Sequence, residues 1–329
     1  NASGSNRLML FHQPFVNQVA ANFPAADVLL GKPMPVAAAN NFYAQFAGGA
    51  FEPSRQLRWL LDSPERVVQY DQLASALGQD MLACIELDVG LHRGGVRSDE
   101  PLIAMLDLIG ASSHLTFCGF MGYEPHVVKV PGDSVAYRDE AMAVYTHYVE
   151  LAKKHLGAQW PEDVLLNAGG SPTYQMYNEG KYPFNELAAG SALVKPSDFD
   201  LPSLSDHQPA SYIATPVLKS LDTLEIPGID LGGLQSLWNP NRKRTFFTYG
   251  GYWKAQPESP EGLSFNPLFG RSTNQEMMNG SQKINLQADD WIFLRPTQSE
   301  FVFLQFGDLL VYENGSIVEN WAVFSEKTT

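Results

Sequence analysis

The sequence of 329 residues is 44% hydrophobic and 18% charged, which supplies enough apolar material for a large domain and a smaller one. Its formal net charge of −14 would repel nucleic acids and anionic membranes. No apolar run reaches the roughly 20 residues that span a bilayer, and the first residues lack the pattern of a signal peptide. Cys84 and Cys118 lie in apolar runs, as reduced and buried thiols do. We therefore expect a cytoplasmic protein that binds neither nucleic acid nor membrane.

The first two thirds of the chain alternate short apolar runs with helical patterns. We predict strands at Arg7–Phe11, Asp27–Gly31, Leu57–Leu61, Met81–Val89, Leu115–Phe120, Val164–Leu166 and Ala192–Lys195. The main helices predicted between them are Pro14–Asn22, Pro35–Phe46, Pro64–Leu77, Pro101–Leu108 and Ala136–Leu156. This order predicts a parallel sheet covered by helices, either open and doubly wound or closed as an eight-stranded barrel. Because a closed barrel needs one more strand, its first strand is expected upstream of this sequence.

Beyond about residue 205 the helical periodicity fades and short alternating runs replace it. These runs are SYIATPVL, RTFFTYGGYW, DWIFLRP, FVFLQFGDLLVY and SIVENWAVF, and they predict an antiparallel β domain. The segment 197–210 is rich in Ser, Asp and Pro, which is typical of a boundary. We therefore predict a barrel domain at 1–205 and a β domain at 206–329.

Local motifs narrow the class of barrel. The segment Glu86–Val96 (ELDVGLHRGGV) resembles the E-(I/V)-D-x-G-x-x-R-x-G-V stretch of D-threonine aldolases and D-serine dehydratases. The segments Gly119–Glu124 (GFMGYE) and Asn167–Thr173 (NAGGSPT) resemble two further motifs of these enzymes, and Leu29–Pro33 resembles the end of one of their strands. The chain thus resembles the fold-type III pyridoxal-phosphate enzymes of the alanine racemase N-terminal domain superfamily over nearly its whole length.

This resemblance implies a (β/α)8 barrel that binds pyridoxal 5′-phosphate (PLP) at the carboxyl ends of its strands. Glycines allow a backbone to approach an anion closely, and hydroxyl and backbone N–H groups donate hydrogen bonds to phosphate oxygens. The residues implied to bind the phosphate are Gly169, Gly170, Ser171 and Thr173, with Gly190 and Ser191 before the last predicted strand. Taken alone, the sequence Gly-Gly-Ser-Pro-Thr is also compatible with a plain turn.

Arg93 and Tyr123 are the residues implied to contact the PLP ring. Arginine does not readily release its proton, so a ring nitrogen facing Arg93 would stay unprotonated, which favours controlled chemistry at Cα. Tyr123, at the end of the next strand, would hold the ring or the phosphate. The alternatives are an arginine in a surface turn and a tyrosine that only packs in the barrel mouth.

Glu86 and Asp88 alternate along one predicted strand and so share a face. Two neighbouring carboxylates are typical of acid–base catalysis. The resemblance implies instead that the acids of this strand orient neighbouring side chains, and this is the role that we expect. A metal-dependent barrel lyase that uses these acids together with histidines is an alternative.

PLP chemistry needs a lysine that forms a Schiff base with the cofactor. In the family this lysine lies on the first barrel strand, before any segment that matches this sequence, so we expect it outside this chain. Lys32, at the end of a later strand, is the candidate within the chain. Many relatives also carry a metal site in the C-terminal domain. Gln298 and Glu300 occupy the matching positions, and an amide with one carboxylate favours a weak Mg²⁺ or Mn²⁺ site over zinc.

These inferences predict a PLP-dependent enzyme whose small-molecule substrate is a D-amino acid, in particular a β-hydroxy one. Aldol cleavage, dehydration and racemisation all remain open. The alternative from another class is a non-catalytic PLP-binding or scaffold barrel. Because relatives form head-to-tail dimers, we also expect a homodimer, with the aromatic stretch Phe246–Trp253 in the β-domain core or in the dimer interface.

Overall fold

A computed structural model describes residues 4–222, 243–267 and 269–324, and they divide into two compact units. Unit 1 comprises the described residues up to Gly190 together with Phe324, and unit 2 comprises those from Ser191 to Val323. The division falls earlier in the chain than the predicted boundary at residue 205, because residues 191–205 pack with the second unit. In the part of the chain that is described, no helix is both long and apolar enough to cross a membrane.

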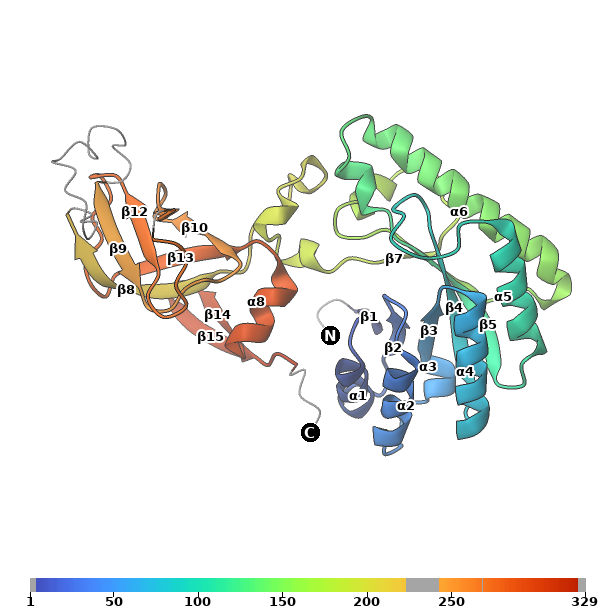
Figure 1. Ribbon diagram of the computed structural model, residues 1–329. Helices are drawn as coiled ribbons and strands as arrows, with labels where there is room; N and C mark the ends of the chain where they lie inside the picture. Colours follow the sequence, from blue (N-terminus) through green and yellow to red (C-terminus); the bar gives the residue numbers. More distant parts are fainter. Residues whose placement is uncertain (1–3, 223–242, 268, 325–329) are drawn as a thin grey trace. The chain divides into compact units, whose positions relative to one another are not determined.

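Unit 1 is built on a parallel sheet of seven strands whose spatial order follows their order in the chain (Figure 1). The strands are β1 (Arg7–Leu10), β2 (Asp27–Leu30), β3 (Leu57–Leu61), β4 (Met81–Leu87), β5 (Leu115–Gly122), β6 (Leu165–Ala168) and β7 (Glu186–Leu187). The flanking helices are α1 (Gln13–Asn22), α2 (Val36–Gln45), α3 (Pro53–Gln56), α4 (Pro64–Leu77), α5 (Asp99–Ala111) and α6 (Ser134–Leu156). The predicted barrel-type α/β architecture is therefore confirmed.

The seventh strand lies elsewhere than predicted. Residues 192–195 were expected to form a strand, but Ser191–Leu193 is a 3₁₀ turn (η4). The Ser191 carbonyl accepts hydrogen bonds from Val194 N at 3.2 Å and Lys195 N at 2.9 Å, which is a helical pattern. The apolar run there is too short to distinguish the two structures by periodicity. The true strand, β7, has only two residues and so leaves no periodic signal.

Local sequence explains why the helices of unit 1 begin and end where they do. The Ser63 side chain accepts from Arg66 N at the start of α4, and Gly78 ends this helix with φ +60°, a left-handed conformation that glycine adopts readily. Asp133 caps α6 by accepting from Val135 N at 2.9 Å. Each cap satisfies backbone groups that a helix end would otherwise leave unpaired.

The strands pack closely in the interior of unit 1. Gly119 on β5 has φ +146°, and a Cβ there would lie 1.8 Å from the Leu165 carbonyl oxygen on β6, so only glycine fits. The two edge strands are linked by an ion pair, in which Arg7 Nη1 on β1 lies 3.0 Å from Glu186 Oε2 on β7. The buried core between sheet and helices includes Val28, Leu30, Leu60, Ile85, Phe120 and Tyr145.

Unit 2 is an antiparallel β domain, as predicted. Its main sheet has the order β10-β13-β8-β9-β12-β11, and β14 and β15 form a separate hairpin. The strands are β8 (Ile213–Leu221), β9 (Arg244–Thr248), β10 (Ala255–Ser259), β11 (Ser264–Phe265), β12 (Met277–Gly280), β13 (Trp291–Pro296), β14 (Leu309–Glu313) and β15 (Ser316–Trp321). The remaining 3₁₀ turns of the two units are η1 (Pro125–Val128), η2 (Gly157–Gln159), η3 (Tyr174–Tyr177), η5 (Ser197–Phe199) and η6 (Pro202–Leu204).

One predicted strand in unit 2 is wrong. The run FVFLQF was expected to be extended, but Ser299–Phe306 forms helix α8. Ser299 and Val302 are its buried residues, a spacing that matches one helical face. An unbroken apolar run gives no period-2 signal, so sequence alone could not separate strand from helix. The stretch 246–253 divides between core and surface, since Phe246 is fully buried whereas Tyr249 and Tyr252 are 68% and 60% exposed.

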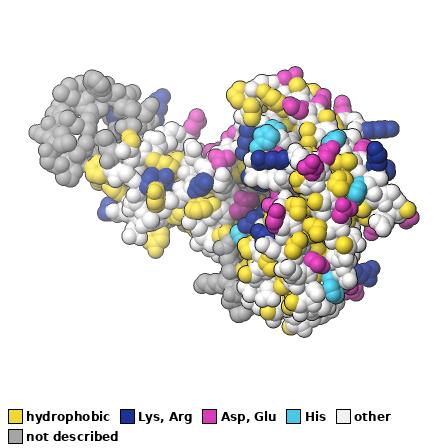
Figure 2. Space-filling model, turned by 45° about the vertical axis from the view of Figure 1, so that its right-hand side comes forward, with side chains coloured by type: hydrophobic (Ala, Val, Ile, Leu, Met, Phe, Trp, Pro, Cys, Tyr) yellow, Lys and Arg dark blue, Asp and Glu magenta, His cyan; other side chains and the backbone are white. Residues whose placement is uncertain are grey.

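Charged side chains of both signs are interspersed on the face of the molecule that Figure 2 shows. On this face the described Lys and Arg side chains form no extended basic stripe.

Candidate functional site at the strand ends of unit 1

Three of the predicted motifs meet in the structure, because they follow the neighbouring strands β4, β5 and β6 (Figure 1). The Arg93 guanidinium carbon lies 5.1 Å from the centre of the Tyr123 ring, within the range of a cation–π contact. Gly170 also lies against the Tyr123 ring, since a Cβ on it would be 2.4 Å from Tyr123 Cε2. The structure therefore brings Arg93, Tyr123 and Gly170 together at the carboxyl ends of the strands.

The Gly-Gly-Ser-Pro-Thr segment forms a tight turn after β6. The Gly170 carbonyl accepts hydrogen bonds from Thr173 N and Tyr174 N, both at 2.9 Å. In such a helical turn the first N–H groups have no partner inside the turn. The buried Gly170 N–H donates no hydrogen bond within the part of the chain that the structure describes. A buried donor of this kind fits an anionic group, as expected of a phosphate-binding turn.

Ser171 and Gly190 also come together, although they are far apart in the sequence. Gly190 N donates to Ser171 Oγ at 3.0 Å, which fastens the chain after β7 to the turn after β6. Ser191 has a different environment, because its hydroxyl lies 2.8 Å from the hydroxyl of Ser299 within unit 2. Gly190 and Ser191 were both predicted to contact the phosphate, and the structure joins Gly190 to the turn after β6 but pairs Ser191 with Ser299.

Glu124 is a site residue to which sequence reasoning assigned no role. Its side chain is fully buried at the end of β5, and it accepts hydrogen bonds from Thr173 Oγ1 at 2.8 Å, Tyr177 Oη at 2.9 Å and Gly169 N at 3.3 Å. The Thr173 hydroxyl and the Gly169 N–H, which were predicted to bind phosphate, are thus used to hold the turn. Burial raises the pKa of Glu124, and the hydrogen bonds from Thr173 and Tyr177 oppose this rise.

Asp88 holds the turn that carries Arg93. Its carboxylate accepts from Gly90 N at 3.1 Å and His92 N at 2.8 Å, and it pairs with Arg97 Nε at 2.8 Å. Burial alone would raise the pKa of Asp88, but the hydrogen bonds from His92 and Gly90 outweigh it and the pKa is lowered. With its oxygens used in this way, Asp88 orients its neighbours.

Glu86 is buried on the same strand, and its carbonyl accepts from Val96 N at 2.8 Å, which closes the glycine-rich turn. The pKa of the Glu86 carboxyl is raised by burial first and by Asp62 second, and the positive charge of Arg93 works against this rise. Glu86 therefore lies where its charge and that of Arg93 influence each other, which fits a role in orienting Arg93.

The lysine and metal predictions concern residues outside this cluster. Lys32 is exposed just beyond the end of β2. In unit 2 the Gln298 amide oxygen accepts from Lys254 Nζ at 2.7 Å, so a positive charge already occupies the surroundings of the predicted metal position beside Glu300. Among the residues that the structure describes, no group of three or more His, Cys, Asp or Glu side chains is arranged to hold a metal ion.

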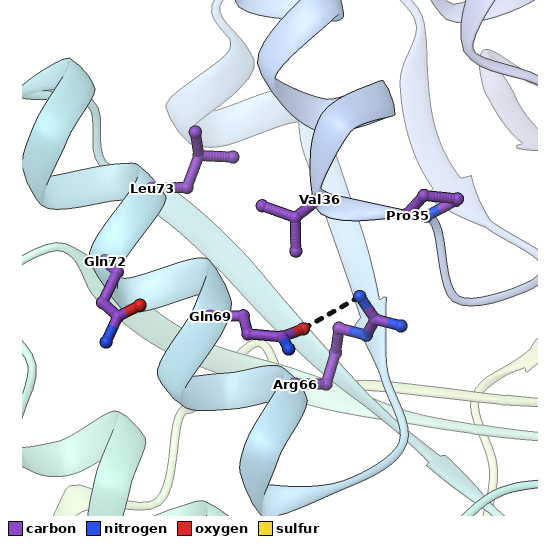
Figure 3. Close-up of a pocket in the computed structure, with 6 residues that line it drawn as sticks. All are labelled: Pro35, Val36, Arg66, Gln69, Gln72 and Leu73. Atoms are coloured by element: carbon purple, nitrogen blue, oxygen red, sulfur yellow. Dashed lines mark hydrogen bonds between the residues drawn. The ribbon is translucent and has the colours of Figure 1, made fainter.

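A separate hollow lies in the helical layer of unit 1, between α2 and α4 (Figure 3). It is lined by Pro35, Val36, Arg66, Gln69, Gln72 and Leu73. Arg66 Nη1 donates to Gln69 Oε1 at 3.0 Å, and the close-up shows these two side chains pointing toward each other from one helix. None of these lining residues belongs to the cluster around Arg93 and Tyr123.

Comparisons with known proteins agree with the fold of the chain. No curated protein matches the chain. Among solved structures, D-threonine aldolase from Filomicrobium marinum matches with a TM-score of 0.74 and 13% identity, over 98% of this chain and 82% of that one. A variant of D-threo-3-hydroxyaspartate dehydratase matches with a TM-score of 0.73 and 13% identity, over 98% and 83%.

Alanine racemase from Clostridium difficile 630 has the same fold, with a TM-score of 0.67 and 13% identity over 98% of this chain and 85% of that one. The family model "Alanine racemase, N-terminal domain" matches residues 31–198, about half of the chain. This segment contains β3–β7 and all of the cluster described above. The chain therefore belongs to the alanine racemase N-terminal domain family, which confirms the family and the fold expected from its motifs.

Proposed function

We propose that the protein is a PLP-dependent enzyme that acts at Cα or Cβ of a D-amino acid. The observation that carries this proposal is the cluster at three neighbouring strand ends, where the buried Gly170 N–H lies beside Tyr123, and Arg93 lies over its ring. An anion-binding donor next to an aromatic side chain and a fixed positive charge suits a flat, phosphorylated cofactor. Similarity to structures named as an aldolase, a dehydratase and a racemase supports the same class.

PLP, when bound, supplies an electron sink that stabilises negative charge at Cα of an amino acid. In this chain the Gly170 N–H and Ser171 would hold the phosphate, and Tyr123 would hold the ring or the phosphate. Arg93 would face the ring nitrogen. Because its guanidinium keeps its proton, it would donate a hydrogen bond without protonating that nitrogen. Asp88 and Glu86 would orient the turn that carries Arg93.

The reaction also needs a lysine beside the cofactor to move the Cα proton. Two sources are proposed. One is a lysine outside this chain, on the first barrel strand, as the resemblance implies. The other is Lys32 at the end of β2, whose exposure leaves its amine accessible. A PLP-binding barrel without catalysis is the remaining candidate if neither lysine reacts.

We propose a β-hydroxy D-amino acid as the substrate. We also propose that the protein works as a homodimer in the cytoplasm. Any divalent metal at Gln298 and Glu300 would be bound weakly. Incubation with PLP and D-threonine or D-serine in deuterated water tests the reaction class. Exchange of the Cα proton indicates racemase-type chemistry, aldehyde release indicates aldol cleavage, and ammonia release indicates dehydration. If none of these products forms from D-amino acids in protein that contains bound PLP, the proposed activity is refuted. Light scattering after gel filtration tests the dimer.

A further inference from the structure

We infer that Glu124 is a positioning residue that shapes the anion-binding turn 169–173 and thereby gives the site its preference for a phosphorylated ligand. This inference rests on the proposed function for the identity of the ligand, but its geometry is independent of it. Glu124 follows β5, whereas all the groups that it accepts from follow β6. One carboxylate therefore connects two neighbouring strand ends.

The hydrogen bonds of Glu124 hold both ends of the turn. Oε2 accepts from Gly169 N at 3.3 Å, at the entry to the turn. Oε1 accepts from Thr173 Oγ1 at 2.8 Å, at its exit, and from Tyr177 Oη at 2.9 Å one turn further on. Gly170, whose N–H has no partner in the described residues, lies between these two anchor points. The direction of that N–H is thus fixed by Glu124.

Both carboxylate oxygens of Glu124 act as hydrogen-bond acceptors. The three partners are all neutral donors, and the side chain is fully buried, so the carboxylate is held by hydrogen bonds rather than by a cation. Glutamine keeps one oxygen, but its NH₂ group would face either the Gly169 N–H, where two donors are opposed, or the two hydroxyl groups, which would then have to turn and accept instead of donate. Either arrangement changes the hydrogen bonds that hold the turn. The turn would therefore shift even though the side-chain volume is unchanged.

The consequence is a defect specific to the phosphate. Glu124 does not lie on the turn that contacts the anion, and it holds no part of the ring cluster directly in its hydrogen bonds. Misdirecting one backbone donor to a charged phosphate weakens phosphate binding by about tenfold or more. Binding of pyridoxal, which has the same ring and no phosphate, should change little.

The test measures the affinity of the protein for PLP, pyridoxal and inorganic phosphate by titration at constant ionic strength, in the wild type and in Glu124→Gln. We expect at least a tenfold loss for PLP and for inorganic phosphate, with pyridoxal within about twofold of the wild type. Glu179→Gln, an exposed glutamate, is the matched control and should change none of the three affinities. Circular dichroism and thermal unfolding verify that each variant is folded.

Thr173 supplies a second route in case Glu124→Gln does not fold. Thr173→Val removes the donated hydroxyl and should reproduce the loss for phosphate, whereas Thr173→Ser keeps the hydroxyl and should restore binding. A general packing role would not produce this rescue. The inference is overturned if Glu124→Gln or Thr173→Val weakens PLP and pyridoxal equally, or if the folded wild type binds no phosphate. If the wild type binds phosphate but not PLP, the proposed function fails while the phosphate titrations still decide the role of Glu124.

Discussion

Gly170→Ala tests the packing at the centre of the candidate site. The backbone of Gly170 is not in the left-handed region, so the new methyl group causes no backbone strain. It would, however, lie 2.4 Å from Tyr123 Cε2 and 3.1 Å from Cδ2, well inside van der Waals contact. Either the ring or the turn must therefore move. Overpacking by one methyl group in a close-packed region costs about 1–3 kcal/mol.

Gly110→Ala, on α5 and outside the candidate site, is the matched control, because a Cβ on Gly110 meets no atom within 4 Å. Denaturant unfolding should show a loss of about 1–3 kcal/mol for Gly170→Ala and no loss for Gly110→Ala. PLP affinity should fall in the first variant only. Removing the ring with Tyr123→Ala should abolish the penalty of Gly170→Ala in the double variant, since the clash is then gone. Equal stabilities and PLP affinities for the two alanine variants would refute the contact between Gly170 and Tyr123.

Three further predictions concern the neighbouring strand and its turn. Asp88→Asn should lower the free energy of unfolding at pH 7 by about 1–3 kcal/mol, because it removes an acceptor for two partly buried backbone N–H groups. The pKa of Asp88 is lowered in the folded state, so this stabilisation is present above its unfolded pKa of about 4 and is lost as the pH falls through the folded value. Urea unfolding of wild type and variant from pH 7 downward should therefore show converging stabilities at acid pH, and a constant difference would contradict the sign. The pKa of Glu86 is raised in the folded state, so the free energy of unfolding of the wild type relative to Glu86→Gln should decline as the pH rises above about 4.5. A relative free energy of unfolding that rises with pH in urea unfolding would contradict the raised pKa of Glu86. Arg93→Ala should weaken PLP binding by about tenfold with little change in stability, because Arg93 is an exposed residue that contacts Tyr123. An unchanged affinity for PLP in titrations of this variant would show that Arg93 does not belong to the site.

The sequence predicted the parts of the fold that have strong patterns. The long buried runs at Leu57–Leu61 and Met81–Leu87 are strands at nearly the predicted residues, because an apolar run between helical patterns has few other solutions in an α/β protein. Residues 192–195 and 301–306 were assigned wrongly, since short or unbroken apolar runs carry no period. There, tertiary packing decides the structure.

The same distinction applies to the site. Arg93, Tyr123 and Gly170 could be predicted because each lies in a motif at the end of a strand, and parallel strands bring such ends together. The role of Glu124 could not be predicted, since its donors lie between 45 and 53 residues further along the chain. Nothing in the local sequence shows that the Thr173 hydroxyl points to this carboxylate rather than to a ligand.

Borohydride reduction after incubation with PLP, followed by peptide mapping, tests most directly whether this barrel is a PLP enzyme. Reduction fixes PLP permanently to any lysine with which it has reacted. We predict a modified lysine on one peptide only, either at Lys32 or at a lysine outside this chain, and this modification should be lost in Gly170→Ala. Protein that remains unmodified, or that is modified evenly over its surface lysines, would contradict the proposal that this barrel is a PLP enzyme.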